Sequence, residues 1–269
     1  MKFKDFYKRY KVPLWVSLGV IGVFFLWWLI SLCLNTTLFP GPEVVLPKFI
    51  SLLGEKKTYE AIGMTLLRLA ASIAISFVLG TLLGVIAGLN EPFRLFIKPF
   101  ISVFKTIPTA AVIFVIIALI KPVYGPIIIV TLMTFPIIYE ATVSGITSID
   151  HNLIDAMKVD NTSTFKSIFK VYLPLSWNYM LLGMVQSIGL GMKVAIMSEI
   201  LSGSTSANGI GMLIRDANTY AYMDQILAYS LMAIIIIGIV DIAIYFIKKK
   251  LKKMTGEKSN WRLGRLFLI

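Results

Sequence analysis

Cysteine and histidine are almost absent from this sequence, which has one of each among its 269 residues. A disulfide framework or a cysteine metal site needs several cysteines, so Cys33 alone excludes both. Because Cys33 lies inside an apolar run, we expect it to be a small buried hydrophobe. The lone His151 excludes the histidine-paired metal motifs, and we expect no metal site in this chain.

Charged residues are also scarce. They make up 15% of the sequence, whereas apolar residues make up 57% and the mean hydropathy is +0.82. A soluble domain has about 25% charged and about 45–50% apolar residues, so most of this chain is expected to lie in lipid. The net charge of +12 would suit nucleic acid, but the distribution of the basic residues favours a membrane surface instead.

Motifs of soluble enzymes are missing too. The sequence has no Gly-x4-Gly-Lys-Ser/Thr, so this chain is not expected to bind ATP through a P-loop. It has no nucleophile elbow. Gly209-Ile210-Gly211 follows no strand and therefore does not indicate a dinucleotide site. We expect no catalytic residues and no cofactor in this chain.

Six apolar runs are long enough to cross a bilayer, which takes about 20 helical residues. The first is too long for a signal peptide. Pro108 is expected to bend the third run, and Pro126 and Pro136 to break the fourth. Small residues four apart at Gly80, Gly84 and Gly88 predict close helix packing. The predicted spans are 14–34, 61–89, 95–120, 122–145, 175–201 and 225–246.

The basic residues predict the orientation of these spans. With both termini in the cytoplasm, eighteen of the 26 Lys and Arg residues fall on the inner side, five on the outer side and three inside spans. Cytoplasmic loops carry this excess in membrane proteins. We therefore predict a multi-pass protein of the bacterial cell membrane with a basic N-terminus, 1–13, and a basic tail, 247–269, both cytoplasmic.

A polar, basic island separates the fourth and fifth spans: DAMKVDNTSTFKSIFKVYLP, residues 155–174. Its spacing predicts short helices at 153–159 and 164–171. Asn161 between them tolerates the left-handed backbone that ends helices. Pro174 suits the first turn of the helix that follows. This arrangement predicts a compact helical knob that docks a partner at the membrane surface.

The island resembles the cytoplasmic loop of the permease subunits of bacterial ABC importers, which reads Glu-Ala-Ala, three residues, Gly, nine residues, Ile-x-Leu-Pro. Asp155-Ala156-Met157, Asn161 and Val171-Tyr172-Leu173-Pro174 keep the spacing, with mild replacements. The resemblance runs from Phe39 to Lys253 and is closest to the branch that serves nitrate, sulfonate, taurine and related small anions or thiamine-precursor-like compounds. It is carried by 65–68, 80–88, 198–201 and 208–214 and departs from the branch at Lys193-Val194.

That resemblance implies an all-α integral membrane fold, with a permease core at 61–246 and a loop at 150–174 that couples to a separate ATPase. It also implies ATP-binding-cassette ATPase subunits holding ATP and Mg²⁺, an extracytoplasmic substrate-binding protein, and a second copy of this chain. Nucleic acid is not an expected partner. The residues expected to couple to the ATPase are Leu153, Asp155, Ala156, Met157, Lys158, Asn161, Leu173 and Pro174.

Ionisable residues inside the spans are candidates for the translocation pathway, because a charge at the bilayer centre costs at least about 2.5–3.5 kcal/mol and so needs a cavity or a partner. We assign Arg68, Lys193 and Glu199 to the pathway. A structural ion pair of Glu199 with Arg68 or Lys193 is an equal alternative. Glu140 also falls inside a span, and we expect Lys105 and Asp241 to snorkel to the interface.

Two other functions remain open at this point. A secondary transporter would need inverted repeats, and the two halves of this sequence do not match convincingly. A membrane assembly protein would usually carry a recognisable soluble domain. Neither function requires an ATPase partner, so the presence of one separates both from a permease subunit.

Overall fold

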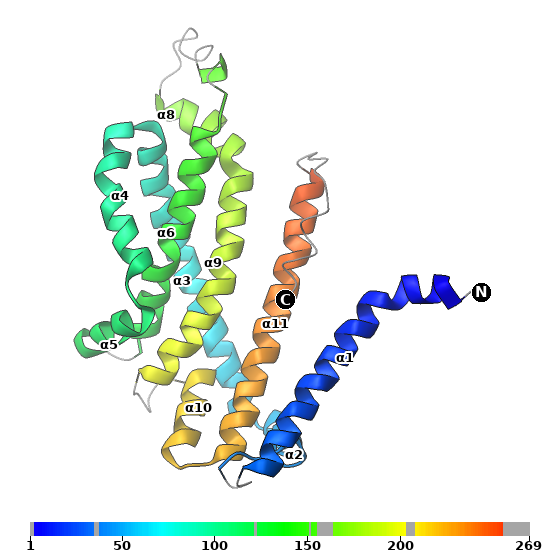
Figure 1. Cartoon of the computed structure of the whole chain (residues 1–269). Coiled ribbons are helices and arrows are strands. Elements are labelled where there is room, and N and C mark those ends of the chain that lie inside the picture. The colour runs from blue at the N-terminus through cyan, green and yellow to red at the C-terminus, as the bar shows by residue number, and fades with distance from the viewer. Residues whose placement is uncertain are drawn as a thin grey trace.

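The computed structural model describes residues 3–34, 38–120, 123–150, 152–154, 164–202 and 208–254. Within these ranges the chain forms helices and no strand. Figure 1 shows an elongated bundle built on three long helices, α3 (Lys56–Leu89), α6 (Gly125–Thr147) and α9 (Leu173–Leu201). Helix α6 packs along both α3 and α9. The predicted all-α membrane fold is confirmed.

The described part of the chain contains five single helices that are long and apolar enough to span a membrane. They include α1 (Phe3–Cys33), α11 (Met223–Met254) and the three central helices. Helices α4 (Glu91–Thr106) and α5 (Thr109–Leu119) are together long and apolar enough to form a sixth span, although they meet at an angle of 96°. The break falls at Ile107-Pro108, where proline forces the preceding residue into extended backbone. The predicted bend at Pro108 is confirmed.

The predicted breaks in the fourth span are wrong, because α6 is continuous. Pro126 lies in its first turn, where the missing N–H has no helical partner to lose, and Pro136 lies inside the helix. Two further helices lie between the predicted spans, where we predicted no helix. They are α2 (Pro42–Leu53), which begins with a proline, and α10 (Ile210–Thr219).

The glycine stripe of α3 fits against one row of side chains on α6. A Cβ added at Gly80, Gly84 or Gly88 would lie 2.9, 2.6 and 2.9 Å from the Cβ atoms of Ile138, Thr142 and Ile146 in turn. These separations are too short for any side chain, so glycine lets the two backbones approach. The predicted close packing is confirmed.

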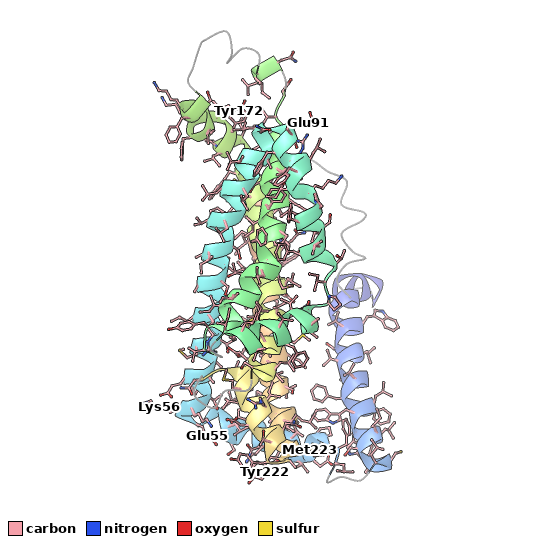
Figure 2. All side chains as sticks on the ribbon, turned by 90° about the vertical axis from the view of Figure 1, so that its left-hand side faces the viewer. Glu55, Lys56, Glu91, Tyr172, Tyr222 and Met223 are labelled. Atoms are coloured by element: carbon pink, nitrogen blue, oxygen red, sulfur yellow. The ribbon has the colours of Figure 1, made fainter. Side chains whose placement is uncertain are left out.

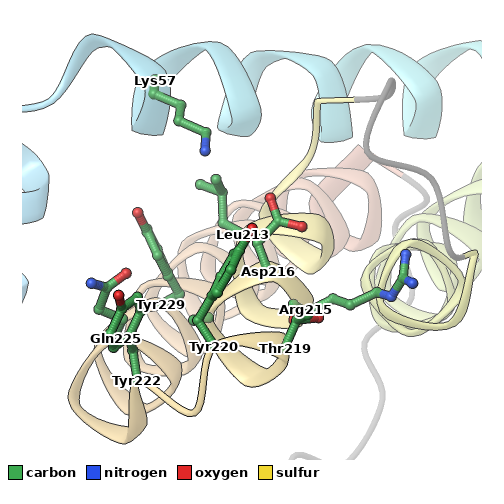
Figure 3. A pocket seen from close by; sticks show the side chains of 10 residues that line it. Lys57, Leu213, Arg215, Asp216, Thr219, Tyr220, Tyr222, Gln225 and Tyr229 are labelled. Carbon is green, nitrogen blue, oxygen red and sulfur yellow. The ribbon is translucent and has the colours of Figure 1, made fainter.

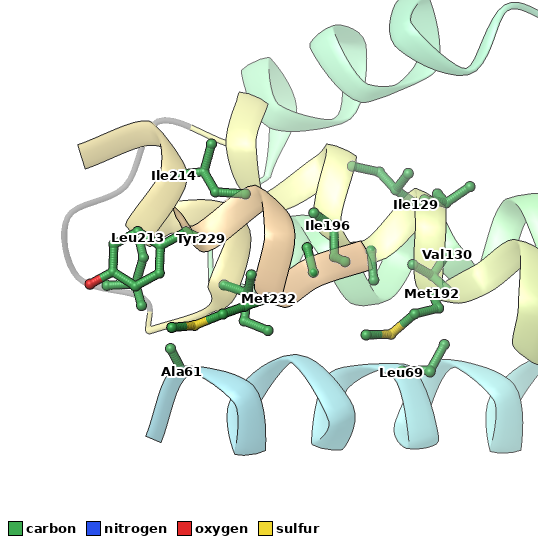
Figure 4. Packing of buried hydrophobic residues seen from close by; sticks show 14 of the residues in the cluster. Ala61, Leu69, Ile129, Val130, Met192, Ile196, Leu213, Ile214, Tyr229 and Met232 are labelled. Carbon is green, nitrogen blue, oxygen red and sulfur yellow. The ribbon is translucent and has the colours of Figure 1, made fainter. Parts of the chain in front are cut away.

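The main apolar core lies where the central helices meet α10 and α11. Leu69 of α3, Val130 of α6 and Met192 of α9 are all buried in it, as Figure 4 shows. Met232 of α11 and Leu213 of α10 extend the same cluster. The core therefore fixes α10 and the start of α11 onto the ends of the central helices.

Helix α1 lies at the edge of the bundle, where its neighbour is α2 (Figure 1). Trp27 Nε1 donates a hydrogen bond to the Pro40 carbonyl over 3.2 Å. Most apolar side chains from Trp15 to Leu34 are exposed, as suits a helix that faces lipid. Cys33 is also exposed, so its predicted burial is wrong, and the reason is this peripheral position.

The two ends of the bundle are distinct. Figure 2 shows Glu91 and Tyr172 at one end, which we call the α8 end after the short helix α8 (Thr164–Ser167). The opposite end carries Glu55, Tyr222 and Met223, and we call it the α10 end. In the predicted topology Glu91 and Tyr172 fall on the cytoplasmic side and Glu55 and Tyr222 on the outer side, so the two predicted sides correspond to the two ends.

Candidate functional site

The first half of the polar island begins with a helical turn. Asp150 starts it, because its Oδ1 accepts from the Asn152 N–H at 2.9 Å and its carbonyl accepts from the Leu153 N–H at 3.1 Å. Leu153 itself is 42% exposed and available for contact. The other predicted coupling residues here lie outside the described residues, namely Asp155, Ala156, Met157, Lys158 and Asn161.

The second half of the island is one continuous helical path into α9. Helix α8 passes into a π-helical turn, η1 (Ile168–Tyr172), and then into α9. The Leu173 N–H donates to the carbonyl of Ile168, five residues back. Pro174 explains this wider turn, since it has no N–H and its ring crowds the carbonyl four residues earlier. The helix predicted at 164–171 and the first-turn position of Pro174 are both confirmed.

At the α10 end, Arg68 and Glu199 form a fully buried ion pair between α3 and α9. Arg68 Nη1 lies 2.8 Å from Glu199 Oε1, and the two side chains are 3% and 0% exposed. The same Nη1 donates to the Asn208 carbonyl at 2.7 Å. Thr65, one turn before Arg68, donates its hydroxyl to the carboxylate at 2.8 Å. The partner of Glu199 is therefore Arg68.

The same carboxylate holds the start of α10. Glu199 Oε2 accepts from the Gly211 N–H at 3.1 Å, and the Thr65 hydroxyl accepts from the Ile210 N–H at 3.1 Å. A carboxylate at a helix N-terminus binds free N–H groups and is favoured by the helix dipole. A Cβ at Gly211 would lie 2.6 Å from the Glu199 Cβ, so glycine permits this approach.

We call Thr65, Arg68, Glu199 and the first turn of α10 the buried node. It joins α3, α9 and α10 at one point. The sequence indicated the two charges and the Gly-x-Gly pattern, but it gave no reason to connect Thr65 with α10. Lys193 lies outside the node on an exposed side of α9, and Asp241 is exposed on α11.

A second ion pair joins α4 to α6. Lys105 Nζ lies 2.8 Å from both carboxylate oxygens of Glu140, and the two side chains are 49% and 47% exposed. The predicted snorkelling of Lys105 is therefore wrong, because its ammonium is held by a carboxylate on the neighbouring helix. Glu140 also borders a groove of about 400 Å³ between α4 and α6, lined by Arg94, Leu95, Lys98, Ile101, Ser102, Tyr139, Glu140, Val143 and Ser144.

A polar pocket of about 390 Å³ opens at the α10 end (Figure 3). Lys57 of α3 faces it from one side, and Asp216 of α10 from the other. The rings of Tyr220 and Tyr222 stack at its rim with centroids 6.0 Å apart. Between them Ala221 has a φ of 56°, and the Tyr222 N–H donates to the Ala217 carbonyl, which closes the end of α10.

Comparison with known proteins gives a consistent result. Residues 80–254 match the family described as binding-protein-dependent transport system inner membrane component. The taurine transport system permease protein of Escherichia coli K12 is 22% identical over 251 residues, which cover 90% of each chain. The bicarbonate transport system permease protein of Synechococcus elongatus is 27% identical over 240 residues, covering 83% of this chain and 82% of that one.

A solved structure has the same fold. It is a chain from a bacterial ABC transporter involved in the import of the acidic polysaccharide alginate, with a TM-score of 0.63 at 16% sequence identity. The match covers 92% of this chain and 98% of that chain. This share is larger than the matched family segment, so the likeness is not confined to residues 80–254.

Proposed function

This chain belongs to the family of binding-protein-dependent transport system inner membrane components, and we propose that within an ABC importer it transmits the work of a separate ATPase to the solute pathway. The family and the taurine permease relative agree with the branch that the sequence resembles. The chain is thus a permease subunit of an importer. Its ATPase, its solute and its orientation are the proposed parts.

The observation that carries the coupling role is the helical path from the polar island to the buried node. Helix α9 has 29 residues and is about 44 Å long at 1.5 Å per residue. Its first turn follows η1 directly, and Glu199 lies near its last turn. A displacement of the island by an ATPase would therefore move α9, and through Glu199 it would move α3 and α10.

The orientation follows from the charge bias and the two ends. We place the α8 end in the cytoplasm, where Leu153 and the rest of the island meet the ATPase. The α10 end then faces outward, and its pocket beside Lys57, Arg215 and Asp216 offers polar and aromatic contacts to an extracytoplasmic binding protein. A second copy of the chain would close the pathway.

A small anionic or polar solute is the substrate class that fits best. The relatives are named for taurine and bicarbonate, and the solved structure for an acidic polysaccharide. Two lysines and an arginine lie along α4, which suits an anion. The binding protein is expected to select the individual solute.

Reconstitution tests this function. The chain, tagged and purified from its own membranes, is expected to bring with it a P-loop ATPase. Proteoliposomes that contain this complex and are supplied with its binding protein should take up a labelled solute only when ATP is present on the side of the membrane that carries the ATPase. A chain that purifies without any ATPase and transports with an ion gradient alone would be a secondary transporter instead.

A further inference from the structure

The two ion pairs inside the spans differ in one decisive respect. Both have N–O distances of 2.8 Å, but the Arg68–Glu199 pair is enclosed within the chain and the Lys105–Glu140 pair is about half exposed. Lipid cannot solvate a half-exposed ammonium and carboxylate. The side of the molecule that carries Lys105 and Glu140 must therefore face water or another protein.

The helix lengths place this pair away from the α8 end. Lys105 lies about 21 Å along α4 from its first residue, at 1.5 Å per residue. Glu140 lies about 22 Å along α6 from Gly125 and about 10 Å from its other end. Lys105 thus lies in the last turn of α4, beside its bend to α5, and Glu140 lies inside α6, so the pair is well away from the α8 end of the bundle.

Cationic side chains continue from this pair toward the α8 end. Arg94, Lys98 and Lys105 are spaced by four and seven residues, so they share one face of α4. Arg94 and Lys98 line the groove together with the hydroxyl-bearing Ser102, Tyr139 and Ser144. Arg94 lies 3.5 Å from the Glu91 carboxylate and Lys105 is bound by Glu140, whereas among the described residues no carboxylate is paired with Lys98.

We propose that this groove between α4 and α6 is the wall along which an anionic solute passes to the cytoplasm, and that Lys105 and Glu140 determine its charge selectivity. The proposal rests on the proposed transport function and names the site within it. An anion entering the groove competes with Glu140 for Lys105 and then meets Lys98 and Arg94. The Glu140 carboxylate keeps Lys105 from holding the anion permanently. When the anion leaves Lys105, the Lys105–Glu140 ion pair forms again and offsets the lost contact.

Cysteine labelling tests the groove with a small sulfonate as the probe. In a Cys33→Ser background, Ser102→Cys and Ser144→Cys are placed singly in the complete complex and treated with two methanethiosulfonates, one anionic (sulfonatoethyl) and one cationic (trimethylammonioethyl). Val78→Cys is the control, since Val78 is exposed on α3 beside an apolar groove and should face lipid. Reagent access from the cytoplasmic side is measured in inside-out vesicles.

We expect both groove cysteines to react and Val78→Cys to remain unmodified. When each rate is divided by that reagent's rate with free cysteine, the anionic reagent should react faster than the cationic one. A unit charge a few ångströms away changes each rate by about fivefold even in water. Lys98→Gln and Lys105→Gln should therefore slow the anionic reagent and speed the cationic one, whereas Glu140→Gln should do the opposite. Lys98→Gln breaks no ion pair, so it tests the proposal even if Lys105→Gln impairs folding.

Three results would overturn the proposal. Unreactive groove cysteines that cross-link between two copies would make this side a dry subunit interface. Unreactive cysteines without cross-linking would place it against lipid or another chain. A faster cationic reagent would exclude anion selection. None of these depends on ATP, so loss of ATP-driven uptake would count against the proposed function alone.

Discussion

Arg68 on α3 donates a hydrogen bond to Glu199 on α9 over 2.8 Å, in a site where neither side chain is appreciably exposed. Glu199 also accepts from the first turn of α10 through the Gly211 N–H. One buried carboxylate thus joins two membrane-spanning helices to a short helix at the α10 end. In the proposed mechanism this junction passes motion of α9 to the outer side.

Removing one member of this pair is expected to destabilise the fold strongly. Arg68→Met would leave Glu199 buried without its counter-ion, at a cost of about 3–5 kcal/mol. The Arg68→Met, Glu199→Met double variant should be less destabilised than the sum of the two single variants. The measurement is apparent melting temperature in detergent for the four chains of the cycle.

Lys193→Met provides the matched control, because it removes a charge from an exposed position on the same helix α9. It should leave the melting temperature unchanged, and it should lower uptake if Lys193 lines the pathway as the sequence predicts. Additive effects of the Arg68 and Glu199 variants would show that the pair is not the connection between α3 and α9.

Close packing of α3 on α6 predicts that Gly84 cannot be enlarged. Gly84→Val would bring its Cβ into the Thr142 side chain and close to the Tyr139 carbonyl, which is backbone and cannot move away. Overpacking of this kind costs about 1–3 kcal/mol or more. Gly63→Val on the same helix meets nothing within 4 Å and is the control. Equal melting temperatures for the two variants would contradict the described helix contact.

Local patterns in the sequence predicted much of this fold. Apolar run lengths predicted the spans, Pro108 predicted the bend, and the glycine stripe predicted the α3–α6 contact. Helices α2 and α10 were missed, since each is short, and α10 depends on buried contacts with α3 and α9 for its position. Pro136 was misjudged because packing on both sides holds α6 together across it.

The candidate site was less predictable. Their positions inside apolar runs marked Arg68, Lys105, Glu140 and Glu199 as unusual, but the sequence left Glu199 with two possible partners and did not connect Lys105 with Glu140. Arg68 and Glu199 are 131 residues apart, and Lys105 and Glu140 are 35 apart. Such pairings depend on how the helices pack, and the residue pattern of one helix does not show which residues of a neighbouring helix it will contact.

Ala221 offers a test of the turn between α10 and α11. It has a left-handed backbone with a φ of 56°, which glycine adopts at lower cost. Ala221→Gly should therefore raise stability by about 0.5–1 kcal/mol. Ala217→Gly, within α10, should lower stability by at least a similar amount. Destabilisation by both changes would contradict the left-handed assignment, with differential scanning fluorimetry as the measurement.

The proposed orientation predicts which residues can be reached from each side. Tags at both termini and at His151 should be cytoplasmic, whereas single cysteines at Glu55 or Asn208 in a Cys33→Ser background should react with a membrane-impermeant maleimide from outside. Intact cells and inside-out vesicles give the two accessibilities. Reaction of Asn208→Cys from the cytoplasmic side alone would reverse the arrangement and would remove the proposed site for the binding protein.

Coupling through the island predicts a sharp contrast between variants of its central residues. Asn161→Gly should be tolerated if Asn161 ends a helix in the left-handed conformation, whereas Asn161→Val should impair coupling because a β-branched residue is strained there. Both are followed by ATP-dependent uptake at equal chain abundance. Full activity of Asn161→Val would contradict the proposed turn.

The most direct test of the central claim is ATPase co-purification with Ala156→Glu. A buried, unpaired carboxylate in the docking surface is strongly unfavourable, so this variant should lose the ATPase while the chain keeps its abundance and melting temperature. Asn161→Gly, five residues along the same island, is the matched control and should retain the ATPase at the level of the unaltered chain. Normal recovery of the ATPase with Ala156→Glu would contradict the account and place the coupling surface elsewhere.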